Sequence, residues 1–343
     1  MSKNATLAVI LIFLVLIASG VIFVGPAKAQ YQGDITINGD GSVTPSSSSI
    51  IQSGFVYTLT SNINGSITVE RSNITLQGNK YTITVPSIFS SGITLNNVSN
   101  CTVTNFTIAG GQYGINIYGT RNVIANNSIS SVNNGIYSID QPSGAITLAG
   151  SSNVISGNNL ANDLVGINFV GGLPTVICSY NLISENTFAD CSLALLFYDS
   201  SFNVIYHNNF IVNTKSVVDS GLGVYPQVVS LNSWDNGYPS GGNYWSDYHT
   251  KASNAQEIDS SGIGNTPYIV NSNNSDNYPL LKLFINKPTV GNATPSPSPT
   301  TLTPSPSIPE FPSLAIPLLL SLMMAAAGLL VHHKKHEQEI KHE

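Results

Sequence analysis

A short motif that recurs four times constrains the fold of this 343-residue chain more than any other feature. Each copy has asparagine at its first and sixth positions, an apolar residue at its second or third position, and another at its eighth. Such self-similarity is the sequence signature of a repeat architecture. The copies are Asn-Val-Ile-Ala-Asn-Asn-Ser-Ile (122–129), Asn-Val-Ile-Ser-Gly-Asn-Asn-Leu (153–160), Asn-Leu-Ile-Ser-Glu-Asn-Thr-Phe (181–188) and Asn-Val-Ile-Tyr-His-Asn-Asn-Phe (203–210), with a weaker copy at 101–108.

The spacing of the copies indicates the type of repeat. Successive copies begin 21, 31, 28 and 22 residues apart, so the shortest unit has about 22 residues and the longer ones hold insertions. That length is too short for a helix pair and fits one coil of three short strands joined by turns. The sequence therefore predicts an all-β fold, a parallel β-helix. The general crossover rule favours a right-handed one.

The asparagines of the motif are expected at the corners of the coils, because asparagine tolerates left-handed backbone and caps turns through its amide. Apolar residues of the same motif then point into the core. Identical side chains at one corner of stacked coils can hydrogen-bond to one another, as they do in cross-strand stacks. We therefore predict a ladder at the sixth motif position, formed by Asn127, Asn158, Asn186 and Asn208.

The N-terminus reads as an export signal. Lys3 precedes an apolar run from Leu7 to Val24, and a small-x-small sequence favours cleavage between Ala29 and Gln30. The alternative is an uncleaved anchor, because the apolar run approaches the length that spans a bilayer. After the predicted signal peptide (1–29) we expect an N-terminal cap with the first coils (30–90), the main coils (91–231) and a C-terminal cassette (232–282).

The C-terminus changes character abruptly. A Pro-, Ser- and Thr-rich stalk (283–312) is followed by a 19-residue apolar segment (313–331), which as a helix could cross a bilayer. The basic tail (332–343) would then lie in the cytoplasm, by the positive-inside rule. The segment predicts a membrane-anchored type I protein on the cell surface.

Composition excludes one class of partner. The formal net charge is −6, whereas a nucleic-acid-binding protein needs a basic surface. Asn-x-Ser/Thr sequons suggest a glycoprotein, although many such triplets arise by chance in an asparagine-rich chain. The three cysteines fit no complete disulfide framework. Cys178 and Cys191 could pair, or all three could be small buried core residues.

The cassette is rich in aromatic residues interleaved with glycine. Its sequence contains Ser-Trp-Asp-Asn-Gly-Tyr-Pro-Ser-Gly-Gly-Asn-Tyr-Trp-Ser-Asp-Tyr (233–248) and Asp-Asn-Tyr-Pro-Leu-Leu (276–281). The aromatics could form a sugar-stacking platform, or they could cover the open end of the last coil; the second interpretation is favoured. The ligand-binding candidates are Trp234, Tyr244, Trp245 and Tyr248.

Together with the asparagine-rich coils, the cassette resembles the NosD-like β-helix proteins that are common on archaeal surfaces. The family takes its name from a periplasmic protein involved in assembling copper sites, so the resemblance implies copper-site maturation as one function. The order Pro-Glu-Phe (309–311), apolar segment, basic tail also resembles the sorting signals of archaeosortases. Cleavage there would replace the helix by a lipid.

The predicted ectodomain, between the signal peptide (1–29) and the apolar segment (313–331), offers little to a metal. Only His207 and His249 occur there, with no methionine and three scattered cysteines, so copper is not expected. A calcium loop would need more hard oxygen ligands than Asp259 and the nearby Asn265 supply. We therefore expect no cofactor and assign no metal-binding residue.

Two classes of function remain. We favour a structural, adhesive or carbohydrate-binding surface protein, whose partners are cell-surface glycans or other envelope proteins. The alternative is a polysaccharide lyase or hydrolase, which would need carboxylates and a base in one cleft. The acidic candidates Asp190, Asp199 and Asp219 are isolated in the sequence and fit turns. We assign no catalytic residue.

Overall fold

The computed structural model describes residues 31–132, 144–171, 178–219 and 230–285, all within one compact unit (residues 1–287). The predicted signal peptide and its cleavage site, nearly all of the stalk, the apolar segment 313–331 and the tail lie outside these residues. Within the described part of the chain, no helix has the length and hydropathy needed to cross a bilayer.

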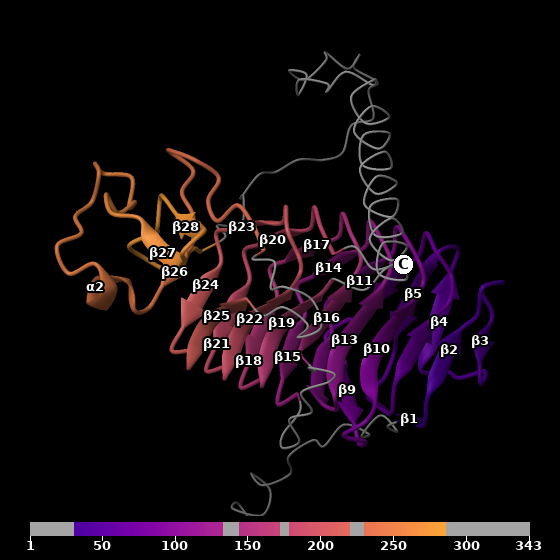
Figure 1. The fold of residues 1–343 in the computed structure, drawn as a ribbon. Helices are drawn as coiled ribbons and strands as arrows, with labels where there is room; N and C mark the ends of the chain where they lie inside the picture. Colours follow the sequence, from indigo (N-terminus) through magenta and orange to yellow (C-terminus); the bar gives the residue numbers. More distant parts are fainter. Residues whose placement is uncertain (1–30, 133–143, 172–177, 220–229, 286–343) are drawn as a thin grey trace, which may run out of the picture. The chain divides into compact units, whose positions relative to one another are not determined.

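Three long sheets run side by side along the unit (Figure 1), here named A, B and C. Sheet A contains β1 (Tyr31–Gln32), β6 (Ile63–Asn64), β9 (Thr82–Val85), β12 (Thr107–Gly110), β15 (Ser128–Ser130), β18 (Asn159–Ala161), β21 (Thr187–Ala189), β24 (Asn209–Ile211) and β26 (Tyr244–Trp245). Sheet B contains β2 (Ile35–Ile37), β3 (Val43–Thr44), β7 (Ile67–Val69), β10 (Ser91–Asn96), β13 (Tyr113–Tyr118), β16 (Ile146–Ala149), β19 (Val165–Val170), β22 (Leu193–Tyr198) and β25 (Lys215–Asp219). Sheet C contains β4 (Ile50–Ser53), β5 (Val56–Leu59), β8 (Thr75–Gln77), β11 (Thr102–Thr104), β14 (Val123–Ala125), β17 (Val154–Ser156), β20 (Leu182–Ser184) and β23 (Val204–Tyr206).

The chain visits the sheets in the repeating order C, A, B, so each coil contributes one strand to each sheet. Along β8 to β25 every strand pairs in parallel with its equivalent in the next coil, for example β14 with β17 and β15 with β18. This topology is a parallel β-helix. The predicted all-β solenoid is therefore confirmed.

The apolar positions of the motif form stacks inside the solenoid. In sheet C the third position is in register from coil to coil, as Ile124 pairs with Ile155 and Ile155 with Ile183. In sheet A the eighth position does the same, with Phe188 paired to Phe210. These side chains are buried, so each coil covers the apolar face of its neighbour. A single coil could not bury this surface alone.

The corners use left-handed backbone, which explains the asparagines and glycines between strands. The corner from sheet C to sheet A has positive φ at Asn105, Asn126, Gly157, Glu185 and His207. Asparagine and glycine adopt this conformation at the least cost. In the motif, a left-handed residue that is at least partly exposed directly precedes the buried asparagine of the sixth position.

The sixth-position asparagines stack at the corner between sheets C and A. The Oδ1 atom of Asn158 accepts the backbone N–H and the side-chain amide of Asn127, both at 3.0 Å. Asn158 donates in the same way to Asn186, and Asn186 to Asn208. Asn208 donates to Asn243, which lies in the cassette and outside the repeat. Because all of these amides are buried, each needs such a partner.

A second ladder occupies the corner between sheets B and C and uses the first motif position. Each backbone N–H donates to the next asparagine Oδ1 atom at 2.9–3.0 Å, beginning at Cys101. Its members are Asn122, Asn153, Asn181, Asn203, Asn232 and Asn274. This ladder also corresponds to the repeat, because asparagine recurs at the first position of every full copy.

The N-terminal end of the solenoid is closed by antiparallel strands. β3 pairs with β2 and β4 pairs with β5, so two short antiparallel strands form the outer edges of sheets B and C at this end. Short edge strands are one way in which proteins limit pairing with another chain.

The three cysteines are free and buried, so the disulfide between Cys178 and Cys191 that the sequence allowed is not formed. Their thiols point to different strands. The Cys178 thiol donates to the carbonyl of Leu148 in β16, and the Cys191 thiol to that of Leu160 in β18. The alternative interpretation, that they are core residues, describes them better.

Candidate functional site

The cassette lies against the last coil and carries β26, the short helix α2 (Tyr248–Lys251) and a hairpin of β27 (Tyr268–Asn271) and β28 (Asn274–Asp276) (Figure 1). β26 continues sheet A by pairing with β24. The ring of Trp245 stacks on Phe210 at a centroid distance of 4.2 Å. Tyr268 stacks on the other face of Trp245 at 4.1 Å. The aromatic stack of sheet A therefore extends from the coils into the cassette.

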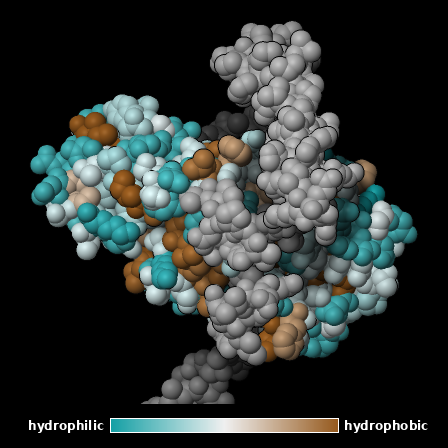
Figure 2. All heavy atoms as spheres, in the orientation of Figure 1, coloured by the Kyte–Doolittle hydropathy of each residue, from teal (hydrophilic) through white to brown (hydrophobic). Residues whose placement is uncertain are grey.

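This packing overturns the sugar-platform interpretation of the cassette aromatics. Trp234, Trp245 and Tyr248 are 2%, 1% and 2% exposed, so no flat face is available to a ligand. Tyr244 is half-buried. In the view of Figure 2 the surface of the cassette is mainly hydrophilic, with scattered hydrophobic residues. These aromatics cover the end of the core, as the favoured interpretation had it.

The hairpin ends both asparagine ladders. Asn274 accepts the N–H of Asn232 at 2.9 Å and the indole N–H of Trp234 at 3.1 Å. Asp276 accepts the indole N–H of Trp245 at 2.9 Å. Because these two hairpin residues are two positions apart on one strand, their side chains point to the same side. One strand thus satisfies donors at two corners of the solenoid.

A groove of about 340 Å³ opens between the last strand of sheet B and the cassette. One wall comes from β25 and the residues before it, and the other from the cassette. Most lining groups are hydroxyls, amides or charges, with two valines and one tyrosine. The lining residues are Asn213, Thr214, Lys215, Ser216, Val217, Ser246, Asp247, Lys251, Tyr268 and Val270.

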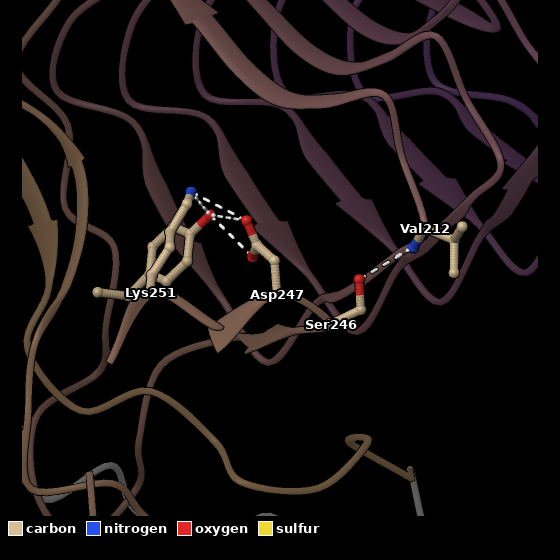
Figure 3. Close-up of polar contacts among 5 residues, drawn as sticks. Val212, Ser246, Asp247 and Lys251 are labelled. Carbon is tan, nitrogen blue, oxygen red and sulfur yellow. Dashed lines mark hydrogen bonds and ion pairs between the residues drawn. The ribbon is translucent and has the colours of Figure 1, made fainter. Parts of the chain in front are cut away.

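Three side chains in this groove form a hydrogen-bonded group (Figure 3). The Nζ atom of Lys251 lies 3.0 Å from Oδ2 of Asp247, and it also donates to the hydroxyl of Tyr268. The Tyr268 hydroxyl donates to the Asp247 carboxylate, with distances of 3.1 and 3.2 Å to its two oxygens. The Lys251 ammonium also lies 4.3 Å from the centroid of the Tyr268 ring. Asp247 directly precedes helix α2 and Lys251 is its last residue, so their side chains meet across one turn.

Two members of this group, Lys251 and Tyr268, have pKa values that are shifted toward their protonated forms. Burial raises the pKa of Tyr268, so its hydroxyl stays protonated at neutral pH. Partial burial lowers the pKa of Lys251, but hydrogen bonds to Tyr268 and Asp247 outweigh it and the net shift is upward. Both groups are therefore shifted away from the form that a general base needs.

Val212 borders the groove and has an unusual backbone. Its φ is 50°, a left-handed conformation that is strained for a β-branched residue. Its N–H donates to the hydroxyl of Ser246 in the cassette at 3.0 Å (Figure 3). This bond attaches the cassette to the last corner between sheets A and B.

Metal-binding residues do not gather in the described part of the chain, where no three His, Cys, Asp or Glu side chains could hold one ion. The ring of His207 stacks on Phe284 at 4.2 Å, and its Nε2 atom lies 2.8 Å from the Ser240 carbonyl oxygen. Burial raises the pKa of Cys178 to about 11 and that of Cys191 to about 12, so both remain thiols. Copper prefers clustered imidazole, thiolate or thioether donors, and these residues do not fit it.

The oxygen-rich loop after α2 is satisfied by its own chain. Asp259 accepts the N–H of Ser261 at 2.7 Å and the hydroxyl of Tyr238. Asn265 accepts the N–H of Gln256 at 3.0 Å.

The acidic residues considered for an enzyme occupy turns or strand ends. Asp190 and Asp199 have positive φ, as corner residues do. The Asp219 carboxylate accepts the N–H and the hydroxyl of Ser230 at 2.7 and 2.9 Å. Among the basic residues, Arg121 lies at the corner between sheets B and C and donates to Asn100, whereas Lys215 lines the groove.

Sequence reasoning missed the groove. Asp247, Lys251 and Tyr268 are polar residues without a recurring pattern, and Tyr268 is 17 positions from Lys251. Only the spacing of four between Asp247 and Lys251 was a readable signal, for an ion pair on a helix. The sequence also did not indicate that the hairpin ends both ladders, because this role depends on how the chain after α2 folds back onto the last coil.

Comparison with known proteins gives two kinds of similarity. A family model described as "Periplasmic copper-binding protein (NosD)" matches residues 34–250. The tailspike protein of E. coli bacteriophage HK620 in complex with pentasaccharide is similar over 57% of this chain and 43% of that chain, with 11% identity and a TM-score of 0.40. A mutant of the same tailspike in complex with pentasaccharide is similar over 64% and 42%, with 13% identity and a TM-score of 0.40. The chain spans less than half the length of these structures. No curated protein matches it.

Proposed function

The chain belongs to the NosD family of β-helix proteins, and we propose that it is an exported member of that family that binds carbohydrate without cleaving it. The single observation that carries this proposal is the polar groove between β25 and the cassette. The groove is held by a rigid solenoid on one side and by a fully packed cap on the other.

The chemistry of the groove matches a carbohydrate. Its hydroxyls and amides from Asn213, Thr214, Ser216 and Ser246 can donate and accept hydrogen bonds, which suits a ligand covered with hydroxyls. Its volume of about 340 Å³ is in the range of small-molecule sites. The Lys251–Asp247 pair adds a fixed donor and a fixed acceptor at one end.

Two other functions receive less support. Cleavage needs a base or a nucleophile, whereas the pKa values of Lys251 and Tyr268 are shifted toward their protonated forms and the Asp247 carboxylate is engaged by both of these groups. Copper handling is implied by the family description, but the described residues hold no cluster of copper donors. Copper is therefore not part of the proposed function.

The location is part of the proposal. The family description is periplasmic, which supports a position outside the cytoplasmic membrane. The predicted signal peptide, the stalk and the apolar segment 313–331 support an anchored surface protein that faces glycans or other envelope proteins. Protease treatment of intact cells tests this, because an anchored ectodomain should be released as a fragment that ends in the stalk.

A glycan array tests the proposed activity. The purified protein should bind a subset of short oligosaccharides and leave them intact, as checked by mass spectrometry of the recovered glycans. Lys251→Gln should weaken binding, since it removes the charge that holds Asp247 and Tyr268 in place. Lys80→Gln is the matched control, because Lys80 is an exposed lysine at a corner of an early coil. Shortened glycans would replace the binding proposal by an enzymatic one.

A further inference from the structure

One corner of the solenoid carries exposed residues that its folding does not explain. At the turn from sheet B to sheet C, each coil places one residue directly before the ladder position, with φ between 56° and 62°. Backbone N–H groups of this row donate to carbonyls at the same corner one coil further on, as Phe202 does to Leu231 at 2.7 Å. We name it the corner row; its members are Asn73, Asn100, Arg121, Ser152, Tyr180 and Phe202.

The early coils show what this backbone favours. Asn73 and Asn100 occupy the row there, and asparagine tolerates the left-handed conformation better than other residues with a Cβ atom. Their side chains also join, since the Asn100 amide donates to Asn73 Oδ1 at 3.1 Å. Arg121 continues the row by donating from Nε to Asn100 Oδ1 at 3.2 Å. Asparagine therefore suits this corner, both by its backbone conformation and by its side-chain hydrogen bonds.

The late coils carry aromatic residues instead of asparagine at this corner. Tyr180 and Phe202 are bulky aromatic residues in a conformation that disfavours them, and they are 66% and 59% exposed. Burial in the core therefore does not account for them. Their rings are stacked across the two coils, with centroids 5.7 Å apart and planes 12° apart. Strained residues that lie outside the core are a reason to look for function.

We propose that the corner row binds a linear polysaccharide that runs along the axis of the solenoid. Sugar rings have apolar faces of C–H groups, and these can pack on the parts of the Tyr180 and Phe202 rings that their mutual stacking leaves exposed, which removes apolar surface from water. Ser152 and Arg121 stand next in the same line and offer hydrogen-bond donors to hydroxyls. A polymer with a regular repeat meets one such group in each coil.

The shape of the row favours a polymer over a protein partner. Two aromatic side chains bury about 150–250 Å² each. A stable protein interface buries about 800 Å² on each partner. The row is also a single line of side chains rather than a broad face. This inference rests on the proposed carbohydrate binding, but it concerns a surface separate from the groove, which takes short oligosaccharides.

The double variant Tyr180→Asn/Phe202→Asn tests the proposal. Asparagine suits the left-handed corner, so the variant should melt at the same temperature as the wild type or higher. Affinity electrophoresis of the purified full chain through gels that contain hydroxyethyl cellulose, galactomannan or alginate should show retardation of the wild type by at least one polymer. The variant should lose at least tenfold in affinity for it. Tyr180→Phe should retain binding, and Phe89→Asn, at another exposed aromatic residue, should leave it unchanged.

Three results would contradict the proposal in distinguishable ways. If the wild type is retarded and the double variant equally so, the corner row is not the site, but the groove proposal stands. If the double variant melts below the wild type, the aromatic pair has a structural role instead. If the wild type is retarded by no polymer and binds no short glycan, the proposed carbohydrate-binding function fails together with this inference.

Discussion

The carboxylate of Asp276 accepts the backbone N–H of Asn243 at 2.7 Å, in the position that an asparagine Oδ1 atom holds in each earlier coil. One coil before, Asn243 itself accepts the N–H of Asn208 at 3.0 Å. An acidic residue thus ends a ladder of neutral amides. Unlike asparagine, its side chain has no NH2 group that needs a further acceptor, which makes it a suitable last rung.

Replacing Asp276 by alanine should destabilise the protein strongly. The carboxyl group accepts hydrogen bonds from the N–H groups of Asn243 and Tyr278 and from the indole of Trp245. Each buried donor left without a partner costs about 1–3 kcal/mol. Urea unfolding should show the loss, and Asp276→Asn, which keeps one acceptor oxygen, should show a smaller one. Equal stability of Asp276→Ala and the wild type would mean that the hairpin does not end the ladder.

Replacing Asp163 by asparagine should stabilise the protein. Its Oδ1 atom accepts the N–H of Val132 at 3.0 Å, but its buried Oδ2 atom has no hydrogen-bond partner. At the equivalent corner two coils later, Asn213 accepts the N–H of Cys191 and donates its amide to the Phe188 carbonyl. Asparagine at position 163 can repeat that pattern.

The expected gain is about 1 kcal/mol or more at neutral pH, measured by urea unfolding. Asn213→Asp is the reverse variant and should lose stability for the same reason. A lower unfolding midpoint for Asp163→Asn would contradict the assignment of Oδ2 as a buried polar atom without a hydrogen-bond partner.

Stability should fall as the pH rises from about 4 to about 8. Burial raises the pKa of Asp276 to about 7 and that of Asp163 to about 8, both above the ordinary value of 3.8. Between the unfolded and folded pKa values the folded state binds more protons, so raising the pH favours unfolding. Each such group removes up to about 1.4 kcal/mol per pH unit.

Urea midpoints measured at about pH 5 and about pH 9 check this dependence. The midpoint should be higher at the lower pH, and the difference should shrink in Asp163→Asn. A midpoint that rises with pH would show that these two carboxyl groups are ionised in the folded protein at low pH.

Replacing Val212 by asparagine should also stabilise the protein. The equivalent corner carries Asn162 and Asp190 in earlier coils, with φ values of 58° and 54°. Valine at φ 50° costs about 1–2 kcal/mol more than a residue suited to this conformation. The N–H bond to Ser246 is kept, because it comes from the backbone. Thermal melting should show a higher midpoint for Val212→Asn and a lower one for the mirror variant, Asn162→Val.

The repeat was enough to predict the coils. Each coil needs apolar residues at its buried positions and residues that tolerate a left-handed backbone at its corners, and both recur in the sequence at fixed positions. The stacking order of Asn127, Asn158, Asn186 and Asn208 follows from the same spacing. The sequence did not indicate that this ladder continues to Asn243, since this residue belongs to no copy of the motif. The sequence also left undecided whether Trp245 is buried, because composition does not distinguish an aromatic cap from an aromatic platform.

The candidate site depended on contacts between distant residues. Tyr268 reaches Asp247 only because the loop after α2 returns to form β27. The groove also needs the position of the cassette beside β25, which the sequence pattern does not encode.

The most direct test of the account is calorimetric titration of the protein with an oligosaccharide selected on the glycan array. The wild type and Lys80→Gln should bind it with the same Kd, and Lys251→Gln should bind at least tenfold more weakly, which corresponds to about 1.4 kcal/mol. The oligosaccharide recovered after the titration should be intact. Equal affinity of all three proteins, or recovery of a shortened glycan, would contradict non-catalytic binding in the groove.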